Sequence, residues 1–364
     1  MPVPTLDTEA QETLLAAAAA APSVHNTQPW RFRFNSRERS VDIFAVWERA
    51  LPETDPQGRA LHISIGAAVF NLRVAAARLG FTPSARLVPG GEDPDLLATV
   101  LLAGPESAAP VAGSADPAGN GAAAGNGVTA ANGAAGEQAP DGPEAAAAAG
   151  TPAALPDLYE PLWQRHSSRK PFTGRPVPQE VLDELVEAAH REDVGILLPD
   201  EAETARLLEL TADAERYNLQ EPGRRKEADA WVVDPGKSRY GIPATALGPL
   251  DASARLPVRE FTGAQREKPA TPFEPNPRLL LLSTRGDGSI DWLKTGQGLE
   301  YVLLLLTAHG LRASLLHQAT EWTDLRWLLR DPLHGRGTPQ TLVRIGYGPE
   351  GAATPRDRPE AVTR

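Results

Sequence analysis

The order of apolar and polar residues predicts regular elements in the first part of the chain. An alanine-rich stretch with helical spacing ends at Pro22, whose ring nitrogen cannot donate a hydrogen bond. Aromatic residues then alternate with arginines in WRFRF, the pattern of a strand buried on one side. We expect a helix over 8–21, a hairpin over 30–46, a helix over 64–79, and strands over 81–88 and 96–102.

The second part of the chain shows the same kinds of pattern. Some segments repeat apolar residues with helical spacing, and others are short apolar runs typical of buried strands. We expect helices over 158–165, 178–190, 201–218, 293–309 and 323–329, and strands over 278–284, 313–316 and 340–345. Between them, residues 231–272 are rich in Pro and Gly and have little periodicity, which indicates a long excursion over the folded body.

The two parts are separated by a segment of very different composition. Residues 104–156 contain no Lys, no Arg and no aromatic side chain, and consist mainly of Ala, Gly, Pro and Asn. Such a segment cannot bury enough apolar surface to offset the entropy of ordering it. We therefore expect a disordered linker with an r.m.s. span of roughly 40 Å, joining an N-terminal half, 1–103, to a C-terminal half, 157–364.

An internal repeat relates the two halves. The segments 66–80 and 296–310 each begin and end with Gly, at a constant offset of 230 (296 − 66 = 310 − 80). We expect a helix that starts and stops at these glycines in each half, the second fully buried because it is apolar almost all round. Chance alignment of two amphipathic helices is the alternative. Duplication would imply a symmetric dimer fused into one chain, with a site built from both halves.

The segment APSVHNTQPWRFRF is the first candidate site. It places Ser23, His25, Asn26 and Gln28 between the end of a helix and the start of a strand. A fixed loop with so many donors and acceptors suits a polar, planar ligand. The alternative is a turn in which these side chains only cap the helix.

The segment RHSSRKPF is the second candidate site. It carries Arg165, Ser167, Ser168 and Arg169 within five residues. Guanidinium groups bind a phosphate dianion in a bidentate manner and hydroxyls donate to it. The alternative is a basic helix end capped by serine.

Charge and composition exclude several classes of function. The net charge of −11 argues against a nucleic-acid or polyanionic-membrane partner. The absence of cysteine excludes disulfides, thiolate metal sites and cysteine nucleophiles. The N-terminus has no basic region typical of a secretory signal, and the leucine-rich run Val302–Leu306 is too short to span a bilayer. We expect a cytoplasmic protein.

Together, APSVHNTQPWRF and RHSSRKPF resemble the flavin-contacting motifs of the nitroreductase family, especially its Acg-type FMN-binding oxidoreductases. The resemblance implies an α+β, nitroreductase-like fold in which two related halves mimic the family's dimer, with one FMN per chain. It assigns no catalytic side chain and no metal. It implies these FMN-binding residues: Pro22, Ser23, Asn26, Gln28, Arg165, His166, Ser167, Ser168, Arg169, His317, Gln318, Arg356 and Arg358.

The sequence departs from the family pattern beside the reactive flavin nitrogen. Where the family usually has an acid followed by Gly, this chain has His317-Gln318. The resemblance implies NAD(P)H-dependent two-electron reduction of nitroaromatics, quinones or similar small acceptors. The alternative is a protein that sequesters FMN under a lid with little turnover, and we expect the excursion 231–272 to be that lid. The chain would be a monomer acting as a pseudo-dimer, or a weak homodimer.

Overall fold

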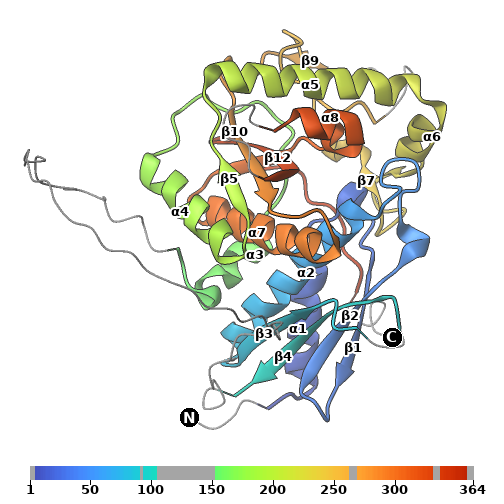
Figure 1. Ribbon diagram of the computed structural model, residues 1–364, viewed down its shortest axis with the longest axis vertical. Coiled ribbons are helices and arrows are strands. Elements are labelled where there is room, and N and C mark those ends of the chain that lie inside the picture. Colours follow the sequence, from blue (N-terminus) through green and yellow to red (C-terminus); the bar gives the residue numbers. More distant parts are fainter. Residues whose placement is uncertain (1–4, 91–92, 105–151, 262–268, 331–336, 359–364) are drawn as a thin grey trace, which may run out of the picture.

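The computed structural model describes residues 5–90, 93–104, 152–261, 269–330 and 337–358. Most of the expected linker, 105–151, lies outside the described residues. The N-terminal and C-terminal parts form one body in which each part contributes a four-stranded sheet (Figure 1). The α+β architecture expected from the sequence is confirmed.

The N-terminal half builds its sheet from two hairpin-like pairs. Its elements are α1 (Thr8–Ala19), β1 (Trp30–Asn35), β2 (Ser40–Ala45), α2 (Arg59–Arg78), β3 (Thr82–Leu87) and β4 (Leu96–Ala103). The strand order is β1-β2-β4-β3, with every neighbouring pair antiparallel. Trp30 and Phe32 of β1 are fully buried, as the aromatic alternation predicts.

The C-terminal half repeats this topology with an insertion. Its elements are α3 (Tyr159–Gln164), α4 (Gln179–Arg191), β5 (Gly195–Leu197), α5 (Glu201–Gln220), α6 (Pro222–Ala230), β10 (Arg278–Thr284), α7 (Ser289–Ala308), β11 (Arg312–Leu315), α8 (Thr323–Leu328) and β12 (Thr338–Gly346). The strand order β5-β10-β12-β11 corresponds to β1-β2-β4-β3, and again all pairs are antiparallel. This agreement supports two related halves; their origin by duplication stays a prediction.

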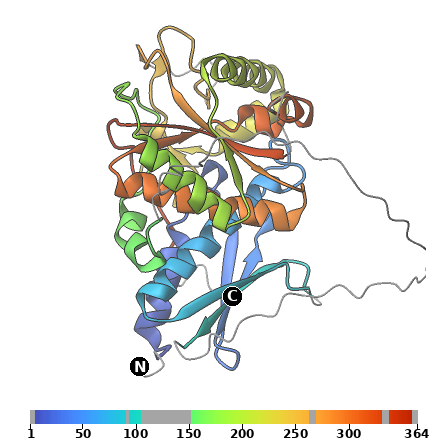
Figure 2. The same cartoon turned by 60° about the vertical axis from the view of Figure 1, so that its left-hand side comes forward.

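The halves meet along α2 and α7, which lie between the two sheets (Figure 2). Both helices have 20 residues and share the offset of the sequence repeat (289 − 59 = 230). A Cβ atom added to Gly66 would lie 2.1 Å from the carbonyl oxygen of Leu293, and one added to Gly296 would lie 2.0 Å from that of Ile63. Only glycine allows the two backbones to approach so closely.

The expected helix starts, at 64 or Gly66 in the first half and at 293 or Gly296 in the second, are wrong. Each of these glycines lies at the eighth position of its helix, and the N-caps are Gly58 and Gly288, which also differ by 230. The sequence pattern missed the first turns because they carry polar residues. Arg59 is one of these polar residues. Its side chain is buried, and its guanidinium donates to the carbonyl oxygens of Gln340 and Thr320.

Gly80 and Gly310 end the helices as expected, with φ angles of 86° and 70°. The helix α2 has the length of a membrane-spanning segment and a mean hydropathy of 1.5, but 83% of that stretch is buried inside the protein. That burial is typical of a core helix.

The excursion begins earlier than the sequence suggests. The chain leaves the sheet after β5 and returns at β10, the position where the N-terminal half has only the short turn between β1 and β2. Besides α5 and the unpredicted α6, the inserted segment has two short parallel pairs. These are β6 (Val232–Val233) with β7 (Ile242–Pro243), and β8 (Leu250–Asp251) with β9 (Ala270–Thr271).

Candidate functional site

A large cavity lies where both halves, the excursion and the C-terminal tail meet. The empty space in and around it, counted together with open solvent at its mouth, amounts to about 1050 Å³. Ten of the thirteen residues expected at the site line it: Pro22, Ser23, Asn26, Arg165, His166, Ser167, Arg169, His317, Gln318 and Arg356. The two sequence motifs are thus brought together in space.

Three expected site residues lie outside this cavity. Ser168 is fully buried and donates to the carbonyl oxygen of Pro349. The backbone around Ser167 pairs with Ala313 like a strand, so neighbouring serines point to opposite sides. Gln28 joins the excursion to the tail, and Arg358 is exposed in the tail. The motif spacing could not show these directions.

The loop after α1 has an unusual backbone. His25, Asn26 and Gln28 have φ angles of 48°, 56° and 48°, in the left-handed region that side chains disfavour. Two serine hydroxyls hold the loop: Ser64 Oγ accepts from the Val24 N–H at 3.1 Å, and Ser23 Oγ accepts from the Gln28 N–H at 3.0 Å. Backbone strain of this kind concentrates at binding sites.

The Asn26 side chain joins the loop to the excursion and the tail. Its Nδ2 donates to the carbonyl oxygens of Gly241 at 2.9 Å and Pro355 at 3.1 Å, while Oδ1 accepts from Arg356 Nη1 at 2.7 Å. The Gly241 N–H in turn donates to the Asn26 carbonyl oxygen. The amide is therefore used for closure of the cavity, a role that the resemblance did not imply.

Two arginines, the buried Arg165 and the half-buried Arg356, line the same part of the cavity. Arg165 Nε lies 3.5 Å from Glu300 Oε1, and the Nε atoms of Arg165 and Arg356 form no hydrogen bond among the described residues. Burial lowers the pKa of Arg356 to about 9, and the neighbouring Arg165 acts in the same direction. Ser167 and the half-buried His166 lie beside them. This set of donors fits a phosphate dianion.

The other end combines cations with neutral histidines. Burial, together with the charges of nearby arginines, lowers the pKa of His25 well below its usual value and that of His317 to about 3. Both imidazoles are therefore neutral at pH 7. The ring nitrogens of His25 have no hydrogen-bond partner among the described residues. Arg169 donates to the carbonyl oxygen of Ala246, and burial lowers its pKa to about 10.

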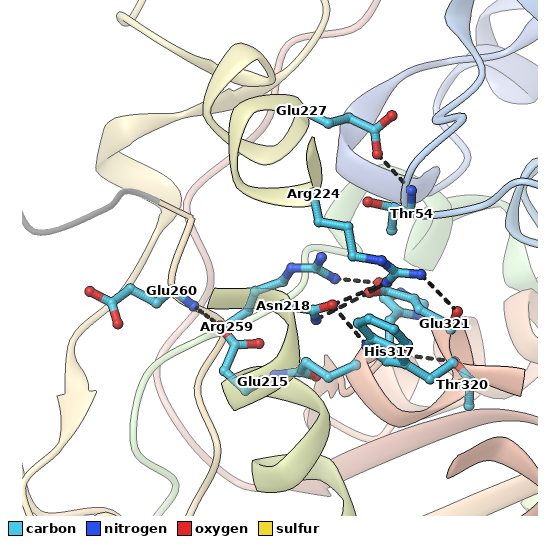
Figure 3. A network of polar contacts seen from close by, with 12 residues as sticks. Thr54, Glu215, Asn218, Arg224, Glu227, Arg259, Glu260, His317, Thr320 and Glu321 are labelled. Atoms are coloured by element: carbon cyan, nitrogen blue, oxygen red, sulfur yellow. Dashed lines mark hydrogen bonds and ion pairs between the residues drawn. The ribbon is translucent and has the colours of Figure 1, made fainter. Parts of the chain in front are cut away.

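A polar network behind the cavity anchors the excursion (Figure 3). Arg259 and Arg224 both form ion pairs with Glu321, and Arg224 also donates to Asn218 Oδ1 at 3.1 Å. The carboxylates of Glu321 and Glu215 outweigh burial and raise the pKa of Arg259. The excursion also reaches the N-terminal half, because Glu227 accepts from the backbone N–H of Thr54 at 2.8 Å.

Sequence reasoning missed several residues around the site. From the excursion, Arg259 and Phe261 line the cavity, and the sequence gives no signal for them because the excursion lacks periodicity. Arg344 and Glu300 do have a signal, since Arg344 is the single charge of the buried strand β12 and Glu300 is the single charge in the buried stretch 295–306 of α7. Among the described residues, no group of three or more His, Asp or Glu side chains is placed to hold a metal ion.

Comparison with known proteins agrees with the two motifs. Residues 162–347 match the model of the nitroreductase family. A Mycobacterium tuberculosis protein provisionally named an NAD(P)H nitroreductase is 29% identical over 349 residues, covering 95% of this chain and 87% of its own. Another from that organism, provisionally named the NAD(P)H nitroreductase Acg, is 25% identical over 362 residues, covering 98% and 96%.

Solved structures are more distant in sequence. A Bacteroides fragilis nitroreductase, crystallised with bound FMN, aligns with a TM-score of 0.34 and 15% identity, over 55% of this chain and 93% of its own. The family match spans slightly more than half of the present chain, and it confirms the resemblance inferred from the motifs. This protein therefore belongs to the nitroreductase family.

Proposed function

We propose that the cavity binds one FMN and that the protein is an NAD(P)H-dependent oxidoreductase acting on small acceptors such as nitroaromatics or quinones. The observation that carries this proposal is the pair of arginines, the buried Arg165 and the half-buried Arg356, at one end of a cavity built from both halves. Membership of the nitroreductase family supports the choice of flavin.

The two ends of the cavity suit the two ends of FMN. Arg165, Ser167 and Arg356 would hold the phosphate through charge-assisted hydrogen bonds. Apolar side chains, among them Leu316 and Val258, provide a surface for a flat ring. Arg169 lies farther along the RHSSR segment. Its positive charge would stabilise added electron density on the flavin ring.

Bound FMN would supply the hydride chemistry between NAD(P)H and the acceptor. The residues of this chain would then bind the flavin, orient it and shield it from solvent. His25 and His317 are neutral, so each can donate one hydrogen bond to a ligand without adding charge. The left-handed loop 24–28 fixes the position of the His25 ring, which lies edge-on to Phe261 with ring centroids 5.3 Å apart.

A second candidate function is retention of FMN with little turnover. It is favoured by the excursion, which contributes Ile242, Leu256, Val258, Arg259 and Phe261 to the cavity wall. Hydrogen bonds from Asn26 and Gln28 hold residues 239–241 against the N-terminal half. A wall fastened in this way would restrict access of NAD(P)H and the acceptor.

Flavin stoichiometry tests the shared part of both candidates. The protein is reconstituted with excess FMN, freed of unbound flavin and heated, and the released FMN is compared with the protein concentration. We expect one FMN per chain, because the motifs occur once each and meet at one cavity. Two per chain, or none, would contradict the composite site.

A further inference from the structure

Glu300 is a buried acid beside the cavity that the proposed function does not use. It lies in the middle of α7, has 0% of its surface exposed, and neither carboxyl oxygen makes a hydrogen bond of normal geometry among the described residues. A buried carboxylate is costly unless a cation compensates it. Its position therefore depends on the charges around it.

Those charges are the two arginines at the phosphate end. Arg165, which follows α3, is 3.5 Å away, and Arg356 comes from the tail. On the side of α2 the nearest polar group is the Asn71 amide, which also favours the ionised carboxyl. Burial acts against these groups and raises the pKa of Glu300 to about 7. The acid is thus poised between its two forms near neutral pH.

The repeat offers an internal comparison. The position in α2 that corresponds to Glu300 is Phe70 (300 − 230 = 70), whose ring stacks on Tyr301 at 4.9 Å. The N-terminal half has no counterpart of the RHSSR motif. A carboxyl group is therefore present at this helical position only in the half that carries Arg165.

We propose that Glu300 is an internal counter-anion that competes with the ligand's phosphate for Arg165 and Arg356 and takes up a proton when the phosphate binds. This inference rests on the proposed function, since it assigns the phosphate to these arginines. Glu300 is a positioning residue: it acts through the arginines and does not line the cavity.

Arg165, Arg356 and Glu300 carry one net positive charge without ligand, and the group carries none once a phosphate dianion is bound and Glu300 is protonated. Without ligand, the ionised carboxylate reduces the repulsion between the guanidinium groups of Arg165 and Arg356. With a phosphate dianion bound, a protonated Glu300 leaves two positive and two negative charges. The phosphate raises the proton affinity of Glu300, so binding consumes a proton and affinity falls as pH rises, by at most about ten-fold per pH unit.

The test measures FMN affinity of the full chain from quenching of flavin fluorescence at pH 7.0 to 8.5. The phosphate remains a dianion in this range because its second pKa is about 6. We expect the wild-type Kd to rise about ten-fold across the range. In Glu300→Gln the Kd should be nearly constant and lower than the wild-type value at pH 8.5.

Two controls isolate the effect. Riboflavin has the same ring without the phosphate, and its affinity should not follow this trend. Glu350→Gln removes an exposed carboxylate that pairs with Arg312, and it should keep the wild-type slope. His166 also lies near both arginines, and burial lowers its pKa below its usual value in the ligand-free protein. A bound phosphate would favour its protonated form, so the comparison of wild type with Glu300→Gln separates the contribution of Glu300 from that of His166.

Calorimetry gives a readout that needs no variant. Proton uptake on binding at pH 8, measured in two buffers of different ionisation enthalpy, should be substantial for FMN and absent for riboflavin. No uptake with FMN, or equal slopes in wild type and Glu300→Gln, would overturn the inference while leaving FMN binding intact. Absence of FMN binding at every pH would instead contradict the proposed function, and the inference with it.

Discussion

Gly66 and Gly296 face each other where α2 crosses α7, and each lacks the side chain that the partner helix's backbone would exclude. These glycines occupy equivalent positions in the sequence repeat, so the crossing point coincides with the pseudo-symmetry between the halves. The close approach brings the loop after α1 and the RHSSR segment to one cavity. The contact between the helices therefore positions the candidate site.

Substituting either glycine tests this contact. Gly66→Ala or Gly296→Ala would place a methyl group about 2 Å from a carbonyl oxygen, and forced overpacking costs about 1–3 kcal/mol or more. We expect a clear fall in Tm and weaker flavin retention. Gly288→Ala is the control, because its Cβ would meet nothing closer than 3.8 Å. Equal Tm values for all three variants would show that the helices can separate without cost.

The arginines at the proposed phosphate end, Arg165 and Arg356, should dominate cofactor affinity. Arg165→Ala or Arg356→Ala removes a charge-assisted hydrogen bond worth roughly 1.5–3 kcal/mol, so FMN affinity should fall about ten- to a hundred-fold. Equilibrium titration measures the loss, and riboflavin affinity should change much less. Arg37→Ala, at an exposed position, serves as the control. An equal loss in that variant would mean that no local phosphate site exists.

The excursion should limit the reduction of bound flavin. Tyr240 hydrogen-bonds to Asp357, and Gln28 donates to the carbonyl oxygen of Arg239, so both fasten this wall from outside the cavity. Each variant removes at least one of these hydrogen bonds, and a hydrogen bond of this kind contributes about 1 kcal/mol. In Tyr240→Phe and Gln28→Ala we therefore expect NADPH to bleach the flavin about five-fold faster for each hydrogen bond lost. Stopped-flow absorbance gives the rates.

A matched control for that experiment is Tyr217→Phe, which alters an exposed tyrosine of α5. Rapid bleaching in wild type, with no increase in the two variants, would contradict a limiting wall and favour unrestricted turnover. Slow bleaching in wild type and faster bleaching in the variants would favour retention of the cofactor as the main role.

The neutral histidines should make the ligand-free protein sensitive to acid. The folded-state pKa of His317 is about 3, far below the ordinary value near 6.5. The neutral His317 therefore makes its full contribution to the free energy of unfolding above pH 6.5. That contribution is lost as pH falls toward 3. At pH 5 the loss is about 2 kcal/mol, from 1.36 kcal/mol for each pH unit.

Urea unfolding at pH 7.5 and pH 5 measures this loss. In His317→Gln, which carries no titratable group at that position, the difference between the two pH values should shrink by about 2 kcal/mol. The carboxylates that also titrate in acid are unchanged in the variant, so they cancel in the comparison. An unchanged difference would show that His317 is protonated in the folded protein at pH 5.

The site was only partly visible in the sequence. Arg165 and Arg169 stand in a compact motif, and the loop around Ser23 and Asn26 in another, so both could be recognised locally. The use of the Asn26 amide could not, because its partners Gly241 and Pro355 are more than two hundred residues away. Arg259 lines the cavity and forms an ion pair with Glu321, which is distant in sequence. No local sequence pattern indicates this contact.

The sequence by itself determined the elements whose periodicity is strong, because such patterns depend on neighbouring residues alone. The strand β10 has the predicted bounds, and the aromatic strand β1 starts at Trp30 as expected. Only the tertiary structure decided that α2 begins at Arg59, because distant carbonyl oxygens compensate that buried charge. It also decided that Gly66 and Gly296 mark a crossing and not a helix start, and that Glu300 lies beside Arg165. The first two depend on contacts between the halves, and the third on a contact between α7 and the segment after α3. The free energy of such contacts overrides local preference.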